Sequence, residues 1–337
     1  MKRLYLNQQN CRTQQAVFTK CKRMSHVTKS EHLIFNAVGN TPLVQLQKIV
    51  PPGSAAVYVK LEYFNPTGSY KDRMALAIIE EAEKRGTLKK GMTVVECTGG
   101  STGTSLAFVC SVKGYRFRVV SSDAFASEKL QSMRLFGAAL ELIPSEGGKI
   151  TPGLIPSMIQ RAQEISAEGN AYLSRQFENR DAIEGYRRMG KEIISQLDTP
   201  VDVFCGAVGT AGMIMGVSAA LRAANPTTKV VVLEPASAPL LSAGTKGSHK
   251  VDGIGVGFVP PMLEKNAYNE VRTVTETDAR HMARRLAAEE GIFAGTSTGL
   301  NIAAAIEIAG ELGPGHTVVT VACDSGMKYL AGGLFDE

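Results

Sequence analysis

The pattern that most constrains the fold is an alternation of short runs rich in β-branched residues with longer amphipathic stretches. The short runs predict strands, because β-branched side chains favour extended backbone, and the longer stretches have the period of helices that bury one face. The predicted pairs of strand and helix are 57–62 with 74–84, 93–97 with 102–113, 117–121 with 126–136, and 201–205 with 211–224, followed by a strand at 229–234, helices at 277–289 and 300–312, and a strand at 316–322. This order predicts the α/β class, with mostly parallel sheets covered by helices, and two closely packed lobes because no Pro- or Gly-rich linker separates them.

The charge distribution restricts the partners of the folded part. Residues 1–30 contain seven basic residues and no acidic residue, whereas the net charge of all 337 residues is +5. The rest of the chain is therefore slightly acidic, which argues against a nucleic-acid-binding face. No apolar run reaches the ~18 residues of a membrane span, so we expect no membrane contact and a cytoplasmic protein.

The basic start of the chain has three interpretations. Residues 1–23 have the acid-poor, Arg- and Gln-containing composition of an organelle-targeting segment. The two interpretations that we favour are a flexible arm and an upstream extension of a protein whose working start is Met24.

Cysteine and histidine spacing gives no indication of a metal. The six cysteines include no C-x-x-C pair, and the five histidines are scattered. We therefore expect reduced thiols and no zinc site.

Three loops rich in glycine and hydroxyl residues are candidates for ligand binding. They lie at 98–103 and 206–212, each after a predicted strand, and at 295–299, before the predicted helix at 300–312. In open parallel sheets, ligands bind beyond the carboxyl ends of the strands. The loop at 206–212 runs into a predicted helix and includes Thr210, an arrangement that suits a phosphate. The same loop, with Glu234 at the end of the next strand, also resembles a dinucleotide-binding unit, although its spacing is G-x-x-G-x-x-G instead of G-x-G-x-x-G.

The loop at 295–299 matches the G-x-S-x-G pattern of serine hydrolases, with Ser297 as the nucleophile. That class requires an acid and then a histidine downstream of the serine. Here His316 precedes Asp324 and no histidine follows, so the pattern does not favour a hydrolase.

Lys71 is the strongest single candidate for chemistry. It follows the turn of the run NPTGSYKDR at 65–73 and stands directly before the apolar stretch 74–84. A lysine held there and partly removed from water would have a lowered pKa and a reactive neutral amine, as a covalent bond to an aldehyde cofactor requires.

The run at 65–73 resembles the lysine motif of the cysteine synthase and cystathionine β-synthase family, which belongs to the fold-type II pyridoxal phosphate enzymes. Similarity extends in the family's order over about residues 34–331. Further matching segments are 39–44, 98–103, 176–179, 209–212, 253–260, the loop that ends at Gly299, 324–326 and 329–330.

The resemblance implies a fold similar to the tryptophan synthase β subunit, with two lobes of twisted, mostly parallel sheets. It implies that 31–42 and 65–179 form the N-terminal lobe, that 43–64 and 180–337 form the C-terminal lobe, and that two copies form a homodimer. It also implies pyridoxal 5′-phosphate as cofactor, carried covalently by Lys71, which later moves the Cα proton of the substrate; Asn40 is a secondary candidate near that site, or a turn residue. The expected cofactor contacts besides Lys71 are Ser101, Gly209, Thr210, Ala211, Gly212, Met213 and Ser297, with Ser297 facing the ring nitrogen; the expected contacts of the substrate carboxylate are Thr98, Gly100, Thr102 and Gln176.

Two loops depart from the family pattern. Where the family usually has T-S-G-N-T-G, this chain has Gly99 in place of a serine that binds the carboxylate and Ser101 in place of an asparagine that binds the cofactor's ring hydroxyl. Where the phosphate loop usually reads G-T-G-G-T, Ala211 and Met213 stand in place of a glycine and a threonine, which removes one hydroxyl donor at a cost of about 1 kcal/mol.

The function implied is replacement at Cβ of an activated serine, O-acetylserine or O-phosphoserine, by a sulfur nucleophile, giving cysteine or a related β-substituted alanine. The alternative within the same cofactor class is β-elimination, of the cysteine desulfhydrase or serine/threonine dehydratase type. A nicotinamide-dependent oxidoreductase built on 206–212 and Glu234 is a distant alternative, and a catalytically inactive family member that binds partners is another.

Overall fold

The computed structural model of the protein describes residues 34–148, 153–332 and 334. The basic start, 1–30, lies outside the described residues, and so do the interpretations of it. From Ala37 onward the described residues form one compact unit, and within it no helix has the length and apolarity needed to cross a bilayer.

The larger of the two sheets has six strands in the order β1-β2-β10-β7-β8-β9. The antiparallel pair is β1 with β2, and the remaining neighbours run parallel. The strands are β1 (Leu43–Gln45), β2 (Ala56–Leu61), β7 (Val203–Ala207), β8 (Lys229–Pro235), β9 (Glu270–Val274) and β10 (Thr317–Ala322). Every residue of β10 is buried, as expected for a central strand covered on both faces.

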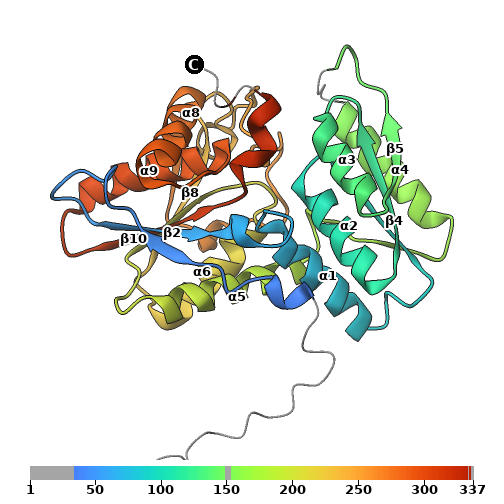
Figure 1. Ribbon diagram of the computed structural model, residues 1–337, viewed down its shortest axis with the longest axis horizontal. Helices are drawn as coiled ribbons and strands as arrows, with labels where there is room; N and C mark the ends of the chain where they lie inside the picture. Colours follow the sequence, from blue (N-terminus) through green and yellow to red (C-terminus); the bar gives the residue numbers. More distant parts are fainter. Residues whose placement is uncertain (1–33, 149–152, 333, 335–337) are drawn as a thin grey trace, which may run out of the picture. The chain divides into compact units, whose positions relative to one another are not determined.

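Helices cover both faces of this sheet. Figure 1 shows α8 and α9 on one face and α5 and α6 on the other. The helices around this sheet are α5 (Asp181–Gln196), α6 (Gly212–Ala224), α7 (Leu240–Ala243), α8 (Glu276–Arg285) and α9 (Thr296–Leu312).

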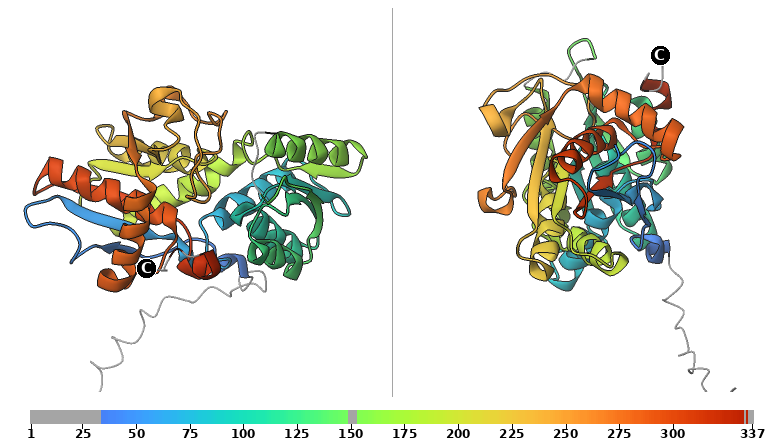
Figure 2. Two further views of the ribbon diagram at one scale, coloured as in Figure 1. Left: turned by 90° about the horizontal axis from the view of Figure 1, so that it is seen from above. Right: turned by 90° about the vertical axis from the view of Figure 1, so that its left-hand side faces the viewer.

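The second sheet has four parallel strands in the order β5-β4-β3-β6. Its strands are β3 (Thr93–Cys97), β4 (Arg116–Ser122), β5 (Ala139–Ile143) and β6 (Ala171–Leu173). Helices α2 (Ser101–Lys113) and α3 (Ser127–Leu135) lie on one face, and α4 (Leu154–Ala167) lies on the other, as Figure 2 shows from above. A further helix, α1 (Lys71–Lys84), packs against both α2 and α5.

The predicted α/β rhythm is confirmed, and the following differences concern where elements begin and end. Helix α1 begins at Lys71 and α9 at Thr296, three and four residues before the apolar stretches that predicted them. Polar residues begin both helices, so hydrophobic periodicity could not find these ends. Gly206, predicted in a loop, lies inside β7. The boundaries of the two lobes remain a prediction.

A buried ionic network fixes α1 against α5. The Arg73 guanidinium donates from Nε to Glu62 Oε2 at 2.7 Å and from Nη1 to Glu192 Oε1 at 2.8 Å. Lys60 Nζ reaches Glu192 at 2.8 Å. Burial opposes ionisation of Glu192, but its hydrogen bonds and charge contacts with Arg73 and Lys60 lower its pKa to about 2. Removal of one partner from such a network strongly lowers the free energy of unfolding, because it leaves a buried charge unpaired.

We expect Arg73→Met to lower the free energy of unfolding by about 3–5 kcal/mol, because Glu62 and Glu192 would lose their shared partner. Denaturant unfolding of the purified protein measures the change. Arg85→Met is the matched control at the other end of α1: its ion pair with Asp181 is exposed, so its loss should cost less than about 1 kcal/mol. Equal losses in the two variants would contradict the importance of the buried network.

Candidate functional site

Lys71 is the first residue of α1, and its side chain is buried, with 6% of its surface exposed. The turn before it is closed by the Asp72 carboxylate, which accepts from Thr67 N at 2.8 Å and from Thr67 Oγ1 at 2.6 Å. Lys71 Nζ lies 4.8 Å from the centre of the Tyr70 ring. The local sequence therefore holds the amine in place instead of leaving it in solvent.

The same turn is hydrogen-bonded to the segment that follows β10. Tyr70 N donates to Cys323 O at 3.0 Å, and Ser325 N donates to Gly68 O at 3.0 Å. These backbone bonds bring Lys71 beside Cys323 and Asp324, although more than 250 residues separate them in sequence.

The surroundings of Lys71 favour its neutral form. Burial lowers its pKa from 10.5 to about 8, and the nearby Cys323 and Asp324 only partly oppose this change. The position at the amino end of α1 acts in the same direction, because the helix dipole disfavours a cation there. At pH 7 about one amine in ten would be neutral, against about one in three thousand for an ordinary lysine.

The loop between β7 and α6 has the geometry of an anion site. Helix α6 begins at Gly212, so its first backbone N–H groups have no acceptor within the helix. These groups and the nearby Thr210 hydroxyl are suited to a phosphate. A Cβ on Gly209 would stand 2.3 Å from Gly253 O, so this position requires glycine.

The two departures from the family's phosphate loop have different structural consequences. Ala211 has φ +68°, in the left-handed region, which costs a residue with a Cβ about 1–2 kcal/mol. The Met213 side chain lies against Gly206, where a Cβ would stand 2.8 Å from Met213 Cε. Gly206 thus makes room for the methionine inside β7.

The loop at 295–299 forms the start of α9, and Ser297 is buried there. Burial raises the pKa of the Cys323 thiol to about 12, and a hydrogen-bonding contact with Ser297 partly opposes this change. Ser297 and Lys71 therefore share Cys323 as a neighbour. His316 lies beyond the opposite end of α9, with Nδ1 3.5 Å from Asp202, so the structure does not assemble a hydrolase triad around Ser297.

The loop at 98–103 joins β3 to α2 and is linked to Gln176. Thr102 Oγ1 donates to Gln176 Oε1 at 2.8 Å, and Gln176 Nε2 donates to Cys97 O at 3.0 Å. The buried Glu96 carboxylate accepts from Gln176 N at 2.9 Å. Three of the four expected carboxylate contacts, Thr98, Thr102 and Gln176, are thus buried, and Gly100 caps α2.

Two contacts connect this loop region to the other parts of the site. Thr67 Oγ1 lies 3.3 Å from Ser105 Oγ on α2. Lys328 Nζ donates to Ser101 Oγ at 3.4 Å, and burial lowers the pKa of Lys328. Sequence reasoning did not find Lys328; its signal was its place two residues after the matching segment 324–326.

Other residues lie around the expected cofactor contacts. The Tyr186 ring stands between the Tyr70 ring, 5.5 Å away, and Gly212, where a Cβ would lie 3.2 Å from Tyr186 Cε2. The hydroxyl of Thr296, the Oδ1 of Asp324 and the hydroxyl of Tyr186 are buried and have no hydrogen-bond partner among the described residues. Unpartnered polar atoms of this kind are typical of a site that a ligand completes.

Asn40 has φ +48°, as a turn residue does. It lines a cavity of about 240 Å³ together with Arg73, Arg188 and Glu192, next to the ionic network of α1. Lys71 does not line this cavity, so the geometry favours the turn interpretation of Asn40.

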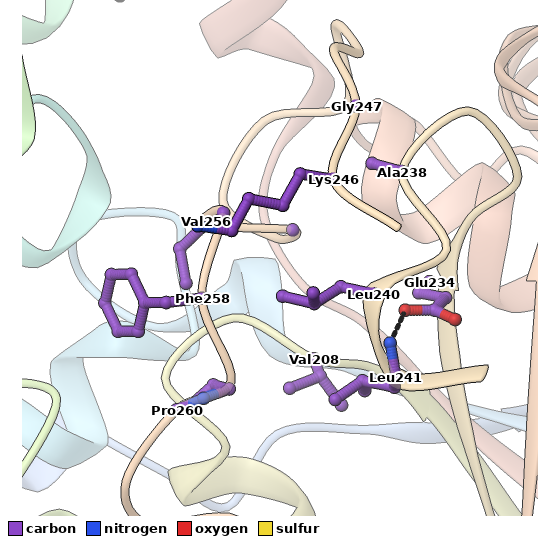
Figure 3. A pocket seen from close by; sticks show the side chains of 12 residues that line it. Val208, Glu234, Ala238, Leu240, Leu241, Lys246, Gly247, Val256, Phe258 and Pro260 are labelled. Atoms are coloured by element: carbon purple, nitrogen blue, oxygen red, sulfur yellow. Dashed lines mark hydrogen bonds between the residues drawn. The ribbon is translucent and has the colours of Figure 1, made fainter. Parts of the chain in front are cut away.

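Glu234 is engaged in a structural role. Its carboxylate accepts from Leu241 N at 2.7 Å at the start of α7, as Figure 3 shows, and from Ser242 N at 2.9 Å. Beside it lies a small cavity of about 30 Å³, lined also by Val208 and Phe258. The geometry therefore gives no support to the dinucleotide interpretation.

The residues present fit pyridoxal 5′-phosphate. A buried amine with a lowered pKa can bond to the aldehyde, and the amino end of α6 can hold the phosphate. Within the described residues, no group of three or more His, Cys, Asp or Glu is arranged to hold a metal ion.

We expect the rate at which pyridoxal phosphate bonds to Lys71 in cofactor-free protein to rise with pH and to level off above about 8, because only the neutral amine reacts. Borohydride trapping at a series of pH values, followed by peptide mass spectrometry, measures this rate. Nα-acetyl-lysine, whose side-chain amine is in water, serves as the reference. A Lys71 rate that still climbs tenfold per pH unit above pH 9 would contradict the lowered pKa.

Comparison with known proteins agrees with this site. The family model described as "Pyridoxal-phosphate dependent enzyme" matches residues 34–324. A cysteine synthase of Staphylococcus aureus is 41% identical over 304 residues, which are 90% of this chain and 96% of the relative. The solved structure of an O-ureido-L-serine synthase is 38% identical, with a TM-score of 0.85 over 90% of this chain and 95% of that one. A solved cysteine synthase of Entamoeba histolytica is 33% identical, with a TM-score of 0.83 over 91% of each chain. The chain therefore belongs to the family of pyridoxal-phosphate dependent enzymes, in its cysteine synthase group, and its reaction is a pyridoxal-phosphate-dependent β-replacement.

Proposed function

We propose that this enzyme replaces the β-substituent of an activated serine, O-acetylserine or O-phosphoserine, by a sulfur nucleophile to form L-cysteine or a related β-substituted alanine. The observation that carries this proposal is the buried Lys71 amine, with a pKa of about 8, beside Cys323, which also neighbours Ser297 at the amino end of α9. The names of the relatives, cysteine synthase and O-ureido-L-serine synthase, support a β-substituted alanine as the product.

Each expected site residue has a proposed role that its position supports. The Lys71 amine would hold the cofactor, and the same amine would move the Cα proton of the substrate, for which a pKa near 8 suits a base at neutral pH. Gly209, Thr210, Ala211, Gly212 and Met213 hold the phosphate at the start of α6. When bound, pyridoxal phosphate stabilises the negative charge that develops at Cα.

The remaining residues orient the reactants. Ser297 is proposed to face the ring nitrogen with a hydroxyl, which, unlike a carboxylate, does not hold that nitrogen protonated, and this favours chemistry at Cβ. Ser101 is proposed to contact the ring hydroxyl, with Lys328 donating to it. Thr98, Gly100, Thr102 and Gln176 are proposed to bind the substrate carboxylate.

Net β-elimination is the second candidate, and Gly99 and Ser101 are the residues that favour it. Gly99 removes one polar side chain from the loop that we propose binds the amino acid, and Ser101 is shorter than the asparagine that the family usually has there. Weaker binding of the amino acid would let the unsaturated product of elimination leave the site before the nucleophile adds to it.

We also propose that the enzyme acts in the cytoplasm as a homodimer, as enzymes that resemble this one commonly do. Sedimentation equilibrium of the purified protein, with a mass near twice 36.0 kDa expected, measures the assembly.

We expect Lys71→Ala to abolish turnover and the borohydride-reducible absorbance of the bound cofactor, because no other described lysine adjoins both Cys323 and Asp324. Incubation with O-acetylserine and sulfide, with cysteine and pyruvate both quantified, measures turnover. Lys84→Ala, at the exposed end of α1, is the control and should keep wild-type activity. Turnover that survives in Lys71→Ala would overturn the proposal, and pyruvate in excess over cysteine in the wild type would select elimination.

Thr210→Val should raise the dissociation constant of pyridoxal phosphate about fivefold to thirtyfold, because the loop would lose a hydroxyl donor worth about 1–2 kcal/mol. Titration of cofactor-free protein by absorbance measures the constant. Thr227→Val, on the exposed turn after α6, tests for general effects of the substitution. Unchanged affinity in Thr210→Val would remove Thr210 from the phosphate site.

A further inference from the structure

An aromatic ring covers one side of the loop at 98–103. A Cβ built on Gly99 would stand 2.1 Å from Phe125 Cγ and 2.2 Å from both Cδ atoms of the ring. Such distances are less than any real contact, so no side chain can occupy position 99 while Phe125 keeps its place. A side chain at position 99 and the Phe125 ring in its present place therefore exclude each other.

Phe125 lies at the edge of the sheet where ligands are expected. Strand β4 is the parallel neighbour of β3 and ends at Ser122, and Phe125 follows in the next turn, with its N donating to Ser122 O at 3.3 Å. The carboxyl ends of parallel strands meet at one edge, where α/β proteins bind their ligands. The partly buried ring packs on a core cluster that includes Val120 and Met158, which holds it against the loop.

One side of the loop at 98–103 is covered by apolar side chains, and the other side is open. A Cβ on Gly103 would stand 2.7 Å from Met133. The Met133 side chain therefore packs against Gly103, as the Phe125 ring packs against Gly99. A Cβ on Gly100 would meet nothing within 4 Å, so the loop is open there. The polar groups on the loop are the first N–H groups of α2, which are available to a ligand, and the hydroxyl of Thr102, which donates to Gln176 Oε1.

We propose that Phe125 is a specificity-determining residue, whose ring forms the apolar wall of the amino-acid site at Gly99 and limits the size of the group carried on the substrate's β-carbon. The inference rests on the proposed function, in which this loop binds the substrate carboxylate. The Phe125 ring occupies the place of the serine side chain that the family usually has at position 99. Because the ring offers no hydrogen bond, it presents an apolar surface to the bound amino acid, while the first N–H groups of α2 hold the carboxylate. A phenyl wall sets an upper limit on size because it cannot shift without disturbing the cluster behind it.

Two amino acids of different size test the proposal in the holoenzyme. Dissociation constants of L-alanine and L-leucine are measured from the change in absorbance of the bound cofactor, in the wild type and in Phe125→Ala. We expect Phe125→Ala to bind L-leucine at least tenfold more tightly relative to L-alanine, since a few methylene groups are worth about that much in an apolar pocket. Phe136→Ala, another partly buried ring, at the far end of α3, is the matched control and should leave the ratio unchanged.

The coupling to Gly99 has its own test. Gly99→Ala should weaken the binding of both amino acids at least tenfold, because its Cβ and the Phe125 ring cannot coexist. The double variant Gly99→Ala/Phe125→Ala should recover to within about threefold of Phe125→Ala. Circular dichroism and cofactor absorbance establish that each variant folds and carries the cofactor.

Several results would overturn the inference. An unchanged L-leucine to L-alanine ratio in Phe125→Ala, or a double variant no better than Gly99→Ala, would show that the ring is only part of the core. A wild type that binds neither amino acid would overturn the proposed function as well. Wild-type binding of L-alanine with an unchanged ratio in Phe125→Ala would leave the proposed function standing and reject the role of Phe125.

Discussion

Removal of the Lys71 amine from water is the constraint on which the site depends. Desolvation costs free energy, and the surrounding structure offsets it by fixing every element around the amine. Asp72 closes the turn, Arg73 ties α1 to Glu62 directly after β2 and to Glu192 on α5, and backbone bonds tie the turn to the segment after β10. Three successive residues of the motif thus have separate roles: Lys71 supplies the amine, Asp72 closes the turn and Arg73 fixes α1.

The two sheets explain why loops distant in sequence meet. Parallel strands of one sheet deliver their following loops to the same edge, as β7 and β10 do in the larger sheet and β3 and β4 do in the smaller one. Contacts between side chains then complete the assembly: Thr67 with Ser105 joins the lysine turn to α2, and Tyr70 joins it to Tyr186 on α5, which lies beside Gly212. Specificity is left to the residues that border the loops, of which Phe125 is one.

Much of this arrangement could be predicted from sequence, because it follows from local patterns. The strand and helix rhythm gave the fold class, and the turn before Lys71 singled out the lysine. The remainder depends on contacts between segments far apart. Nothing near Gly99 in sequence indicates that a phenylalanine 26 residues later excludes its side chain, and nothing near Lys328 indicates that it reaches Ser101. The early start of α1 likewise depends on hydrogen bonds of Thr67 and Asp72 that hydrophobic periodicity does not register.

Four helices begin at residues assigned to this site: α1 at Lys71, α2 at Ser101, α6 at Gly212 and α9 at Thr296. The amino end of a helix carries about half a positive elementary charge, which arises from peptide groups and does not titrate. The site can therefore keep an electrostatic potential that attracts phosphate and carboxylate groups even at a pH where its lysines are neutral. Because this potential resides in the backbone, substitution of any single side chain would leave most of it in place.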